Sequence, residues 1–173
     1  MSFEELVVWV TGASRGIGLA IAKGFAHRNS TVILSSRSEE RLLGALETIG
    51  NDRRTFLFPC DVSSPEEVER TYNKLLNSNL KVNVLVNNAG NYFPGQFLDY
   101  PLQKFDESFA TNVRGVFLCT QAVLSNMLEN NFGIIVNILS VVVHKPFINS
   151  SVYSATKSAI WGLSRALREE VRG

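Results

Sequence analysis

The chain has 173 residues, of which 45% are apolar and 19% are charged, and its formal net charge is +1. This length and balance predict a single globular domain over residues 1–173, and so small a net charge gives no general attraction to nucleic acid or to an anionic membrane. The acidic N-terminal segment, with its short apolar run, is typical of neither a signal peptide nor a membrane span. The two histidines and the two cysteines, Cys60 and Cys119, lack metal-ligand spacing, so we predict no metal site. Buried free thiols favour a cytoplasmic location.

Apolar runs alternate along the chain with segments of helical periodicity. In chain order, the pattern predicts a strand at 6–11, a helix at 17–28, a strand at 31–36, a helix at 38–50, a strand within 54–62, a helix at 63–77, a strand within 82–90, a helix over 102–130, a strand at 133–140 and a helix from 151 to the end. Ser38, Gly50 and Pro65 stand where a helix cap, a helix stop and a first-turn proline are expected. This alternation requires a parallel sheet with right-handed crossovers, so the predicted fold class is α/β, a doubly wound parallel sheet.

A glycine-rich turn, "TGASRGIG" at residues 11–18, joins the first predicted strand to the first helix. Such a turn lets the backbone approach a pyrophosphate, whose charge then lies at the helix N-terminus. We expect a side chain at Gly12 or Gly16 to fill the space of the phosphate, and one at Gly18 to hold the helix away from the strand. No Gly-Lys-Ser/Thr follows, which disfavours a phosphate-loop NTPase.

The end of the second predicted strand bears on the choice between NAD and NADP. An acid about 20 residues beyond the glycines would bind the adenosine ribose hydroxyls and favour NAD. Here Arg37 occupies that region, and no acid occurs before Glu39. Arg37 and Arg15 are both placed to meet a 2′-phosphate, whose geometry suits a guanidinium group. The sequence therefore favours NADP(H) over NAD(H).

The last predicted helix contains "YSATK" at residues 153–157. Tyr153 and Lys157 are four residues apart and therefore lie on one helical face. An ammonium near a phenol stabilises the phenolate, which would help Tyr153 act as a general acid or base. We expect Ser140 to close the fifth strand, where its hydroxyl and the phenol can converge on one carbonyl oxygen. An ordinary amphipathic surface pair remains the alternative for this motif alone.

The combination of residues 11–18, "NNAG" at 87–90, Asn112, Ser140 and residues 153–157 resembles the short-chain dehydrogenase/reductase family. The match covers essentially the whole chain, in order and in spacing. The resemblance implies a Rossmann fold with strand order 3-2-1-4-5 and a carbonyl reductase similar to 3-oxoacyl-carrier-protein reductases and general ketone reductases. It also implies a small-molecule carbonyl or alcohol substrate, and a homodimer or homotetramer in the full-length form.

The resemblance implies a role for each matching residue. Tyr153 would be the general acid, Ser140 the hydrogen-bond donor to the carbonyl, Lys157 the ligand of the nicotinamide ribose, and Asn112 the anchor of a water in a proton relay. The catalytic set is thus Asn112, Ser140, Tyr153 and Lys157. The implied cofactor-binding residues are Gly12, Ser14, Arg15, Gly16, Ile17, Gly18, Arg37, Asp61, Val62, Asn88, Ala89, Gly90, Tyr153 and Lys157, with Asp61 at the adenine.

The chain departs from the family pattern in two places. Leu139 stands where a serine is more usual, although Ser140 keeps the donor position. Family members also continue beyond the last helix into a sixth strand and a substrate-covering segment, so we expect this chain to be a fragment of a longer enzyme. Three hypotheses for the function remain: an NADP(H)-dependent reductase, a non-catalytic NADP(H)-binding module or fragment that lacks the substrate half, and a scaffold with no nucleotide affinity. NADPH binding and oxidation would separate them.

Overall fold

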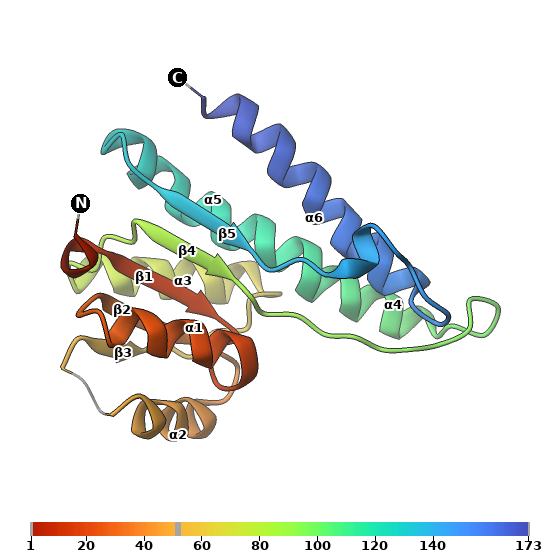
Figure 1. The fold of residues 1–173 in the computed structure, drawn as a ribbon, viewed down its shortest axis with the longest axis horizontal. Coiled ribbons are helices and arrows are strands. Elements are labelled where there is room, and N and C mark those ends of the chain that lie inside the picture. Colours follow the sequence, from red (N-terminus) through yellow and green to blue (C-terminus); the bar gives the residue numbers. More distant parts are fainter. Residues whose placement is uncertain (1, 51–52, 173) are drawn as a thin grey trace.

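The computed structural model describes residues 2–50 and 53–172, and a single parallel sheet forms its centre (Figure 1). Within these ranges the sheet has five strands in the order β3-β2-β1-β4-β5, and every neighbouring pair is parallel. The strands are β1 (Val7–Thr11), β2 (Thr31–Ser35), β3 (Thr55–Leu57), β4 (Val84–Asn87) and β5 (Ile134–Asn137). The predicted α/β class, the doubly wound parallel sheet and the strand order are therefore confirmed.

Among the residues that the structure describes, six α-helices connect or follow the strands. They are α1 (Gly16–Ala26), α2 (Glu39–Ile49), α3 (Pro65–Asn77), α4 (Leu102–Phe109), α5 (Gly115–Glu129) and α6 (Ser151–Glu170). The Ser38 hydroxyl accepts a hydrogen bond from the Arg41 backbone N–H at the start of α2, and Gly50 ends that helix at a φ of 109°. Pro65 opens α3 as predicted. No helix in the described part of the chain is long and apolar enough to cross a membrane.

The strands bury both of their faces, because successive side chains point to opposite sides. On one side Val8 and Val10 of β1 pack with residues of α1 and α2, such as Ala22 and Leu42. On the other side Trp9, which is fully buried, belongs to a core that includes residues of α3 and α5. Helices therefore cover both faces, and the carboxyl ends of the strands are left to form a site.

The long helix predicted at 102–130 is interrupted by a π-helical turn, Ala110–Arg114, between α4 and α5. Its middle residue, Asn112, is buried and hydrogen-bonds to Asn91 and Thr156, which lie far away in sequence. π-helical turns within α-helices often occur at functional sites. Periodicity alone did not reveal this one, since its partners come from other parts of the chain.

The fifth strand is shorter than predicted. It ends at Asn137, so Ser140 does not close it, and that prediction is wrong. The chain leaves the sheet after the Ile138 N–H has donated to the Asn87 carbonyl, and Ser140 instead caps the short 3-10 turn Val141–Val143. This turn then packs against α6.

Candidate functional site

Hydrogen bonds join the ends of β1 and β4 and form the floor of the site. The Thr11 hydroxyl accepts from the backbone N–H groups of Asn88 and Ala89 and donates to the Val86 carbonyl. The Asn88 side-chain amide donates to the carbonyls of Thr11 and Gly12, at 3.0 and 3.1 Å. These contacts fix the glycine-rich turn against the loop that follows β4.

The three glycines of the turn are required for different physical reasons. Gly12 and Gly16 both have positive φ angles, of 63° and 58°. A Cβ at Gly12 would lie 2.8 Å from the Ala89 Cα, so its missing side chain makes room for the β4 loop, a reason other than the predicted one. A Cβ at Gly16 would meet nothing within 4 Å, which leaves open space for a ligand. At Gly18 a Cβ would lie 2.5 Å from the Asn88 Nδ2 atom and 2.6 Å from the Gly12 carbonyl oxygen.

A cleft of about 490 Å³ opens above this floor. Eleven of the predicted cofactor-binding residues line it: Gly12, Ser14, Arg15, Gly16, Ile17, Arg37, Asp61, Val62, Asn88, Ala89 and Gly90. Gly18 lies beneath the turn, and Tyr153 and Lys157 also lie outside the lining of this cleft. The open space above Gly16 and the start of α1 fit a diphosphate, because a helix N-terminus offers free N–H groups to an anion.

Three arginines line the cleft. Arg15 comes from the glycine-rich turn, Arg37 from the loop after β2, and Arg41 from the first turn of α2. Within residues 2–50 and 53–172, none of the three forms an ion pair. Three unpaired guanidinium groups on one cleft make it suited to an anion.

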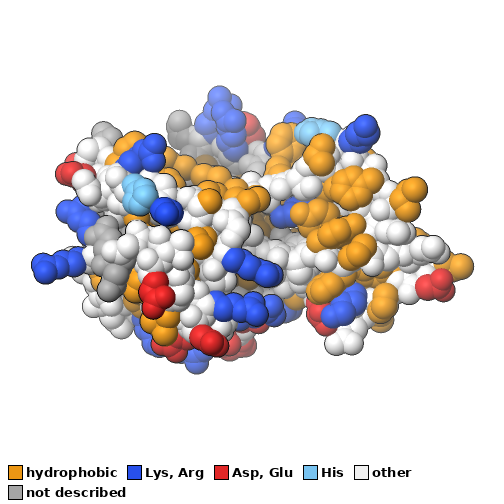
Figure 2. Space-filling model, turned by 60° about the horizontal axis from the view of Figure 1, so that its bottom comes forward, with side chains coloured by type: hydrophobic (Ala, Val, Ile, Leu, Met, Phe, Trp, Pro, Cys, Tyr) orange, Lys and Arg blue, Asp and Glu red, His pale blue; other side chains and the backbone are white. Residues whose placement is uncertain are grey.

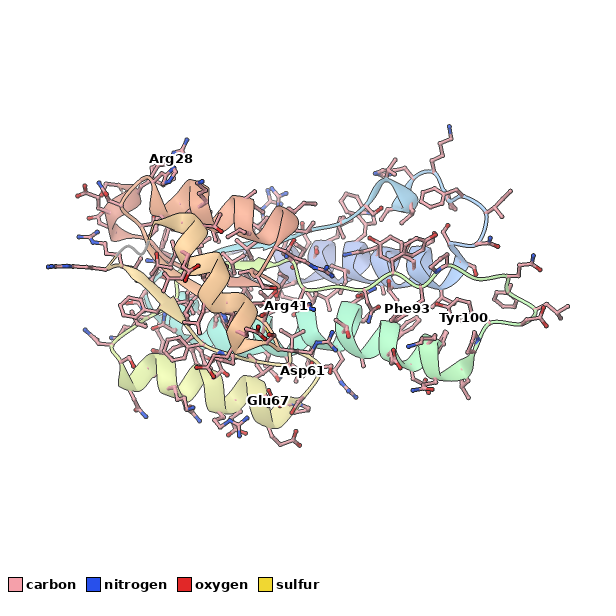
Figure 3. The ribbon with its side chains drawn as sticks, turned by 90° about the horizontal axis from the view of Figure 1, so that it is seen from below. Arg28, Arg41, Asp61, Glu67, Phe93 and Tyr100 are labelled. Carbon is pink, nitrogen blue, oxygen red and sulfur yellow. The ribbon has the colours of Figure 1, made fainter. Side chains whose placement is uncertain are left out.

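Asp61 lies in the loop after β3 and lines the same cleft as Arg41; both residues are labelled in Figure 3. Its carboxylate accepts two hydrogen bonds from Ser63, and its backbone N–H donates to Glu67 of α3. The Asp61 carboxylate is therefore held in place by its own loop and remains on the surface of the cleft. Burial raises the pKa of the neighbouring Cys60 thiol, so this thiol stays protonated.

Tyr153 and Lys157 lie one turn apart on α6, as the sequence predicts. The Lys157 Nζ atom is 5.8 Å from the centre of the Tyr153 ring and donates to the Ile138 carbonyl at 2.7 Å. Burial lowers the pKa of Lys157, because an ammonium loses hydration away from water. A Cβ on Gly90 would lie 3.8 Å from the Lys157 Nζ atom and 3.2 Å from the Asn112 Oδ1 atom. The structure therefore brings Lys157, Asn112 and Gly90 to one place.

The Asn112 side chain is engaged on both of its polar atoms. Its Oδ1 accepts from the Asn91 N–H at 2.8 Å, and its Nδ2 donates to the Asn91 carbonyl at 2.9 Å and to the Thr156 hydroxyl at 3.2 Å. This residue therefore ties the loop after β4 and helix α6 to the π-helical turn.

Ser140 is less closely joined to the other predicted catalytic residues. Its Oγ accepts from the Val142 N–H at 3.4 Å, which leaves the hydroxyl hydrogen free. Within the described residues no hydrogen bond links Ser140 to Tyr153. Its connection is indirect, through the Lys157 contact with the Ile138 carbonyl two residues earlier.

Several site residues were not predicted from the sequence. They are Thr11, Ser36, Ser38, Arg41, Cys60, Asn91, Tyr92 and Thr111. For Arg41 the available signal was its place in the first turn of the helix that follows Arg37. Tyr92 follows the "NNAG" segment closely, but nothing local indicates that its ring packs on Tyr153.

Comparisons with known proteins agree with this arrangement. Residues 6–173 match the family model described as short chain dehydrogenase. A 3-oxoacyl-[acyl-carrier-protein] reductase of Aquifex aeolicus is 35% identical over 173 residues, which cover 99% of this chain and 70% of that protein. An uncharacterized oxidoreductase of Staphylococcus aureus is 30% identical, with 96% of this chain and 72% of that protein covered.

Solved structures of dehydrogenases are also similar to this chain. Serine dehydrogenase from Escherichia coli superposes with a TM-score of 0.90 at 30% identity, covering 96% of this chain and 76% of that one. The closed form of serine dehydrogenase complexed with NADP+ has the same TM-score and identity, and 66% of that chain is covered.

Proposed function

Since the chain belongs to the short-chain dehydrogenase family, and is by that membership an oxidoreductase, we propose that it transfers a hydride between NADP(H) and a carbonyl or alcohol substrate, with Tyr153 as general acid and base. The observation that carries the proposal is the meeting of Lys157, Asn112 and Gly90, with Tyr153 one helical turn away. Gly90 also lines the cleft, so this group of residues borders the space assigned to the cofactor.

The preference for NADP(H) over NAD(H) is supported by charge. Arg15, Arg37 and Arg41 line one cleft, and none of these three described side chains is engaged in an ion pair. A 2′-phosphate adds two negative charges that such groups can bind, whereas a ribose hydroxyl does not use them. The NADP+ complex of a structural relative agrees with this choice.

Each residue of the site has a part in the proposed reaction. NADPH, when bound, supplies the hydride. Tyr153 gives its proton to the carbonyl oxygen, and Ser140 donates the hydroxyl hydrogen that its own contact with Val142 leaves free. Lys157 holds ribose hydroxyls and stabilises the phenolate that remains. The Asn112 nitrogen donates twice inside the protein and its oxygen accepts once, so we assign Asn112 chiefly to positioning the π-helical turn, while the second lone pair of its oxygen can accept from a relay water.

An apolar substrate is supported by the surface near Tyr153. The loop 141–150 exposes Val141, Phe147 and Ile148, the last of them by 88%. Figure 2 shows hydrophobic side chains gathered at the right of the view, over the part of the molecule that includes this loop. We propose ketones and 3-oxoacyl thioesters as the substrate class, the latter in line with the reductase of Aquifex aeolicus.

Assembly and location complete the proposal. Leu102 of α4, Phe117 of α5 and Trp161 of α6 are exposed by 73%, 47% and 40%. Burial of such apolar side chains would stabilise a homodimer or homotetramer built on these helices. Cys60 and Cys119 are buried free thiols, which suits a reducing cytoplasm.

The proposal is tested by NADPH consumption with a panel of ketones, aldehydes and 3-oxoacyl thioesters. We expect oxidation in step with product formation, and a loss of about 10²–10⁴-fold in turnover for Tyr153→Phe with NADPH affinity retained. Equal turnover in Tyr153→Phe would remove the tyrosine from its role. NADPH binding without oxidation by any member of the panel would favour a non-catalytic binding module, and no binding at all would favour a scaffold.

A further inference from the structure

The Tyr153 ring is in contact with a second tyrosine that the proposed reaction does not use. The centres of the Tyr92 and Tyr153 rings are 4.9 Å apart, and the ring planes are inclined by 51°. This distance lies within the range at which aromatic pairs attract each other beyond their burial of area. Tyr92 is 43% exposed, so part of its side chain remains in contact with solvent.

Within the described part of the chain, the Tyr153 side chain has few polar or aromatic partners besides Tyr92. Among the described residues, its hydroxyl makes no hydrogen bond, and the Lys157 Nζ atom is 5.8 Å from its ring centre. Within residues 2–50 and 53–172, the Tyr92 ring is the only aromatic ring paired with Tyr153. A general acid must be held near its acceptor, since a misplacement of about 1 Å can cost ~10²-fold in rate.

The backbone next to Tyr92 is firmly fixed. Asn91 exchanges two hydrogen bonds with the Asn112 side chain, and its own amide donates to the Glu107 carbonyl and the Thr111 hydroxyl. The loop beyond is also secured, because the Tyr100 hydroxyl donates to the Phe93 carbonyl at 2.9 Å (Figure 3). Tyr92 therefore extends from a rigid support.

The hydrogen bonds of Asn112 also connect it, through Thr156, to the backbone of Tyr153. The Asn112 amide also donates to the Thr156 hydroxyl, which in turn donates to the Tyr153 carbonyl at 2.8 Å. The backbone of Tyr153 is therefore tied through Asn112 to Asn91, and its ring is packed against the next residue, Tyr92. This closed set of contacts couples the position of the phenol to the loop after β4.

We infer that Tyr92 is a positioning residue for Tyr153, whose aromatic ring holds the phenol of the general acid in place. The inference rests on the proposed function. The ring matters and the Tyr92 hydroxyl does not, because within the described residues that hydroxyl makes no hydrogen bond. Phenylalanine should therefore replace Tyr92, and leucine should not.

The experiment compares Tyr92→Leu, Tyr92→Phe and the control Phe3→Leu. Phe3 belongs to a similar tilted pair with Phe25, with ring centres 6.1 Å apart, and is 48% exposed. It lies in the 3-10 turn Phe3–Glu5, which precedes the N-terminal end of β1 and so is remote from the site. We expect kcat to fall about 10- to 100-fold in Tyr92→Leu, with the KM for NADPH changed less than about twofold. Tyr92→Phe and Phe3→Leu should stay within about threefold of the parent. A kcat for Tyr92→Leu within twofold of the parent, or an equal loss in Tyr92→Phe, would overturn the inference.

A second readout needs no turnover. In protein labelled with 3-fluorotyrosine, the fluorine NMR signal of Tyr153, identified through its loss in Tyr153→Phe, should move in Tyr92→Leu and remain in Phe3→Leu. If the parent binds NADPH and consumes no carbonyl substrate, the proposed function fails, yet a moved signal still supports the positioning contact. A Tyr153 signal that is unchanged in Tyr92→Leu would overturn it whatever the activity.

Discussion

Replacing Gly18 by alanine should destabilise the protein, although alanine is the better helix former. The new Cβ would lie 2.5 Å from the Asn88 Nδ2 atom and 2.6 Å from the Gly12 carbonyl oxygen, nearly 1 Å inside ordinary contact. The Gly12 carbonyl is backbone within the glycine-rich turn and cannot move without shifting that turn. The Asn88 amide can move only by giving up its hydrogen bonds to the carbonyls of Thr11 and Gly12.

The magnitude follows from these two contacts. Two neutral hydrogen bonds contribute about 1 kcal/mol each, and overpacking a filled site costs roughly 1–3 kcal/mol. The helix propensity of alanine over glycine returns at most about 1 kcal/mol. The free energy of unfolding of Gly18→Ala should therefore fall by about 2–4 kcal/mol, which for a chain of this size lowers Tm by roughly 4–16 °C.

Gly24→Ala in the same helix is the matched control. A Cβ there would have the Arg28 Nη1 atom as its nearest neighbour, at 3.8 Å, which is ordinary contact. Only the helix propensity then changes, and the free energy of unfolding should rise by about 0.5–1 kcal/mol. Urea unfolding of the parent and both variants, with equal m values, measures the difference. If Gly18→Ala proved as stable as Gly24→Ala, the close packing of α1 on the Asn88 amide would be refuted.

Two further substitutions test the arginines and the buried ammonium. Arg41→Ala should weaken NADPH binding roughly 10- to 100-fold, because it removes one charge-assisted hydrogen bond to the 2′-phosphate. The affinity for NADH, which lacks this phosphate, should stay within about twofold of the parent. Equal weakening in titrations of both cofactors would contradict a 2′-phosphate contact. Lys157→Met should lower turnover by ~100-fold or more while the chain stays at least as stable as the parent at neutral pH, because the variant no longer buries a charge. Burial lowers the pKa of Lys157 below its ordinary 10.5, so the unfolded chain binds this proton more tightly than the folded one. The stability of the parent relative to Lys157→Met should therefore rise as pH increases toward 10.5, and a constant difference across that range in urea unfolding would argue against a buried ammonium.

The parts of the fold that the sequence predicted are those with local causes. The Ser38 cap, the Gly50 stop and the first-turn Pro65 each depend on residues within one helical turn, and all three are found as predicted. The strand order needed the family resemblance, because apolar runs reveal strands but not which strands are neighbours. The π-helical turn at Asn112 escaped prediction since its hydrogen-bond partners lie 21 and 44 residues away.

The candidate site divides in the same way. Residues of the glycine-rich turn line the cleft as expected, because a strand, a turn and a helix in sequence already fix their arrangement. Arg41 was missed because its presence in the cleft depends on how α2 lies on the sheet. The predicted reason for glycine at position 12, room for a phosphate, was also wrong. A side chain there would meet Ala89, and only the pairing of β1 with β4 brings Ala89 near Gly12.

The position of Tyr153 shows why a sequence motif alone cannot identify a residue as a general acid. Spacing places Tyr153 and Lys157 on one helical face, but an exposed helix could carry the same pair with no function. The structure adds the elements that a surface pair would lack: Lys157 is buried and bonded to the Ile138 carbonyl, and Tyr153 packs against Tyr92 from another loop. Burying an ammonium with so few partners costs stability, and a cost of this kind is typical of functional residues. The surroundings of Tyr153 and Lys157, more than their spacing, therefore indicate chemistry at this place.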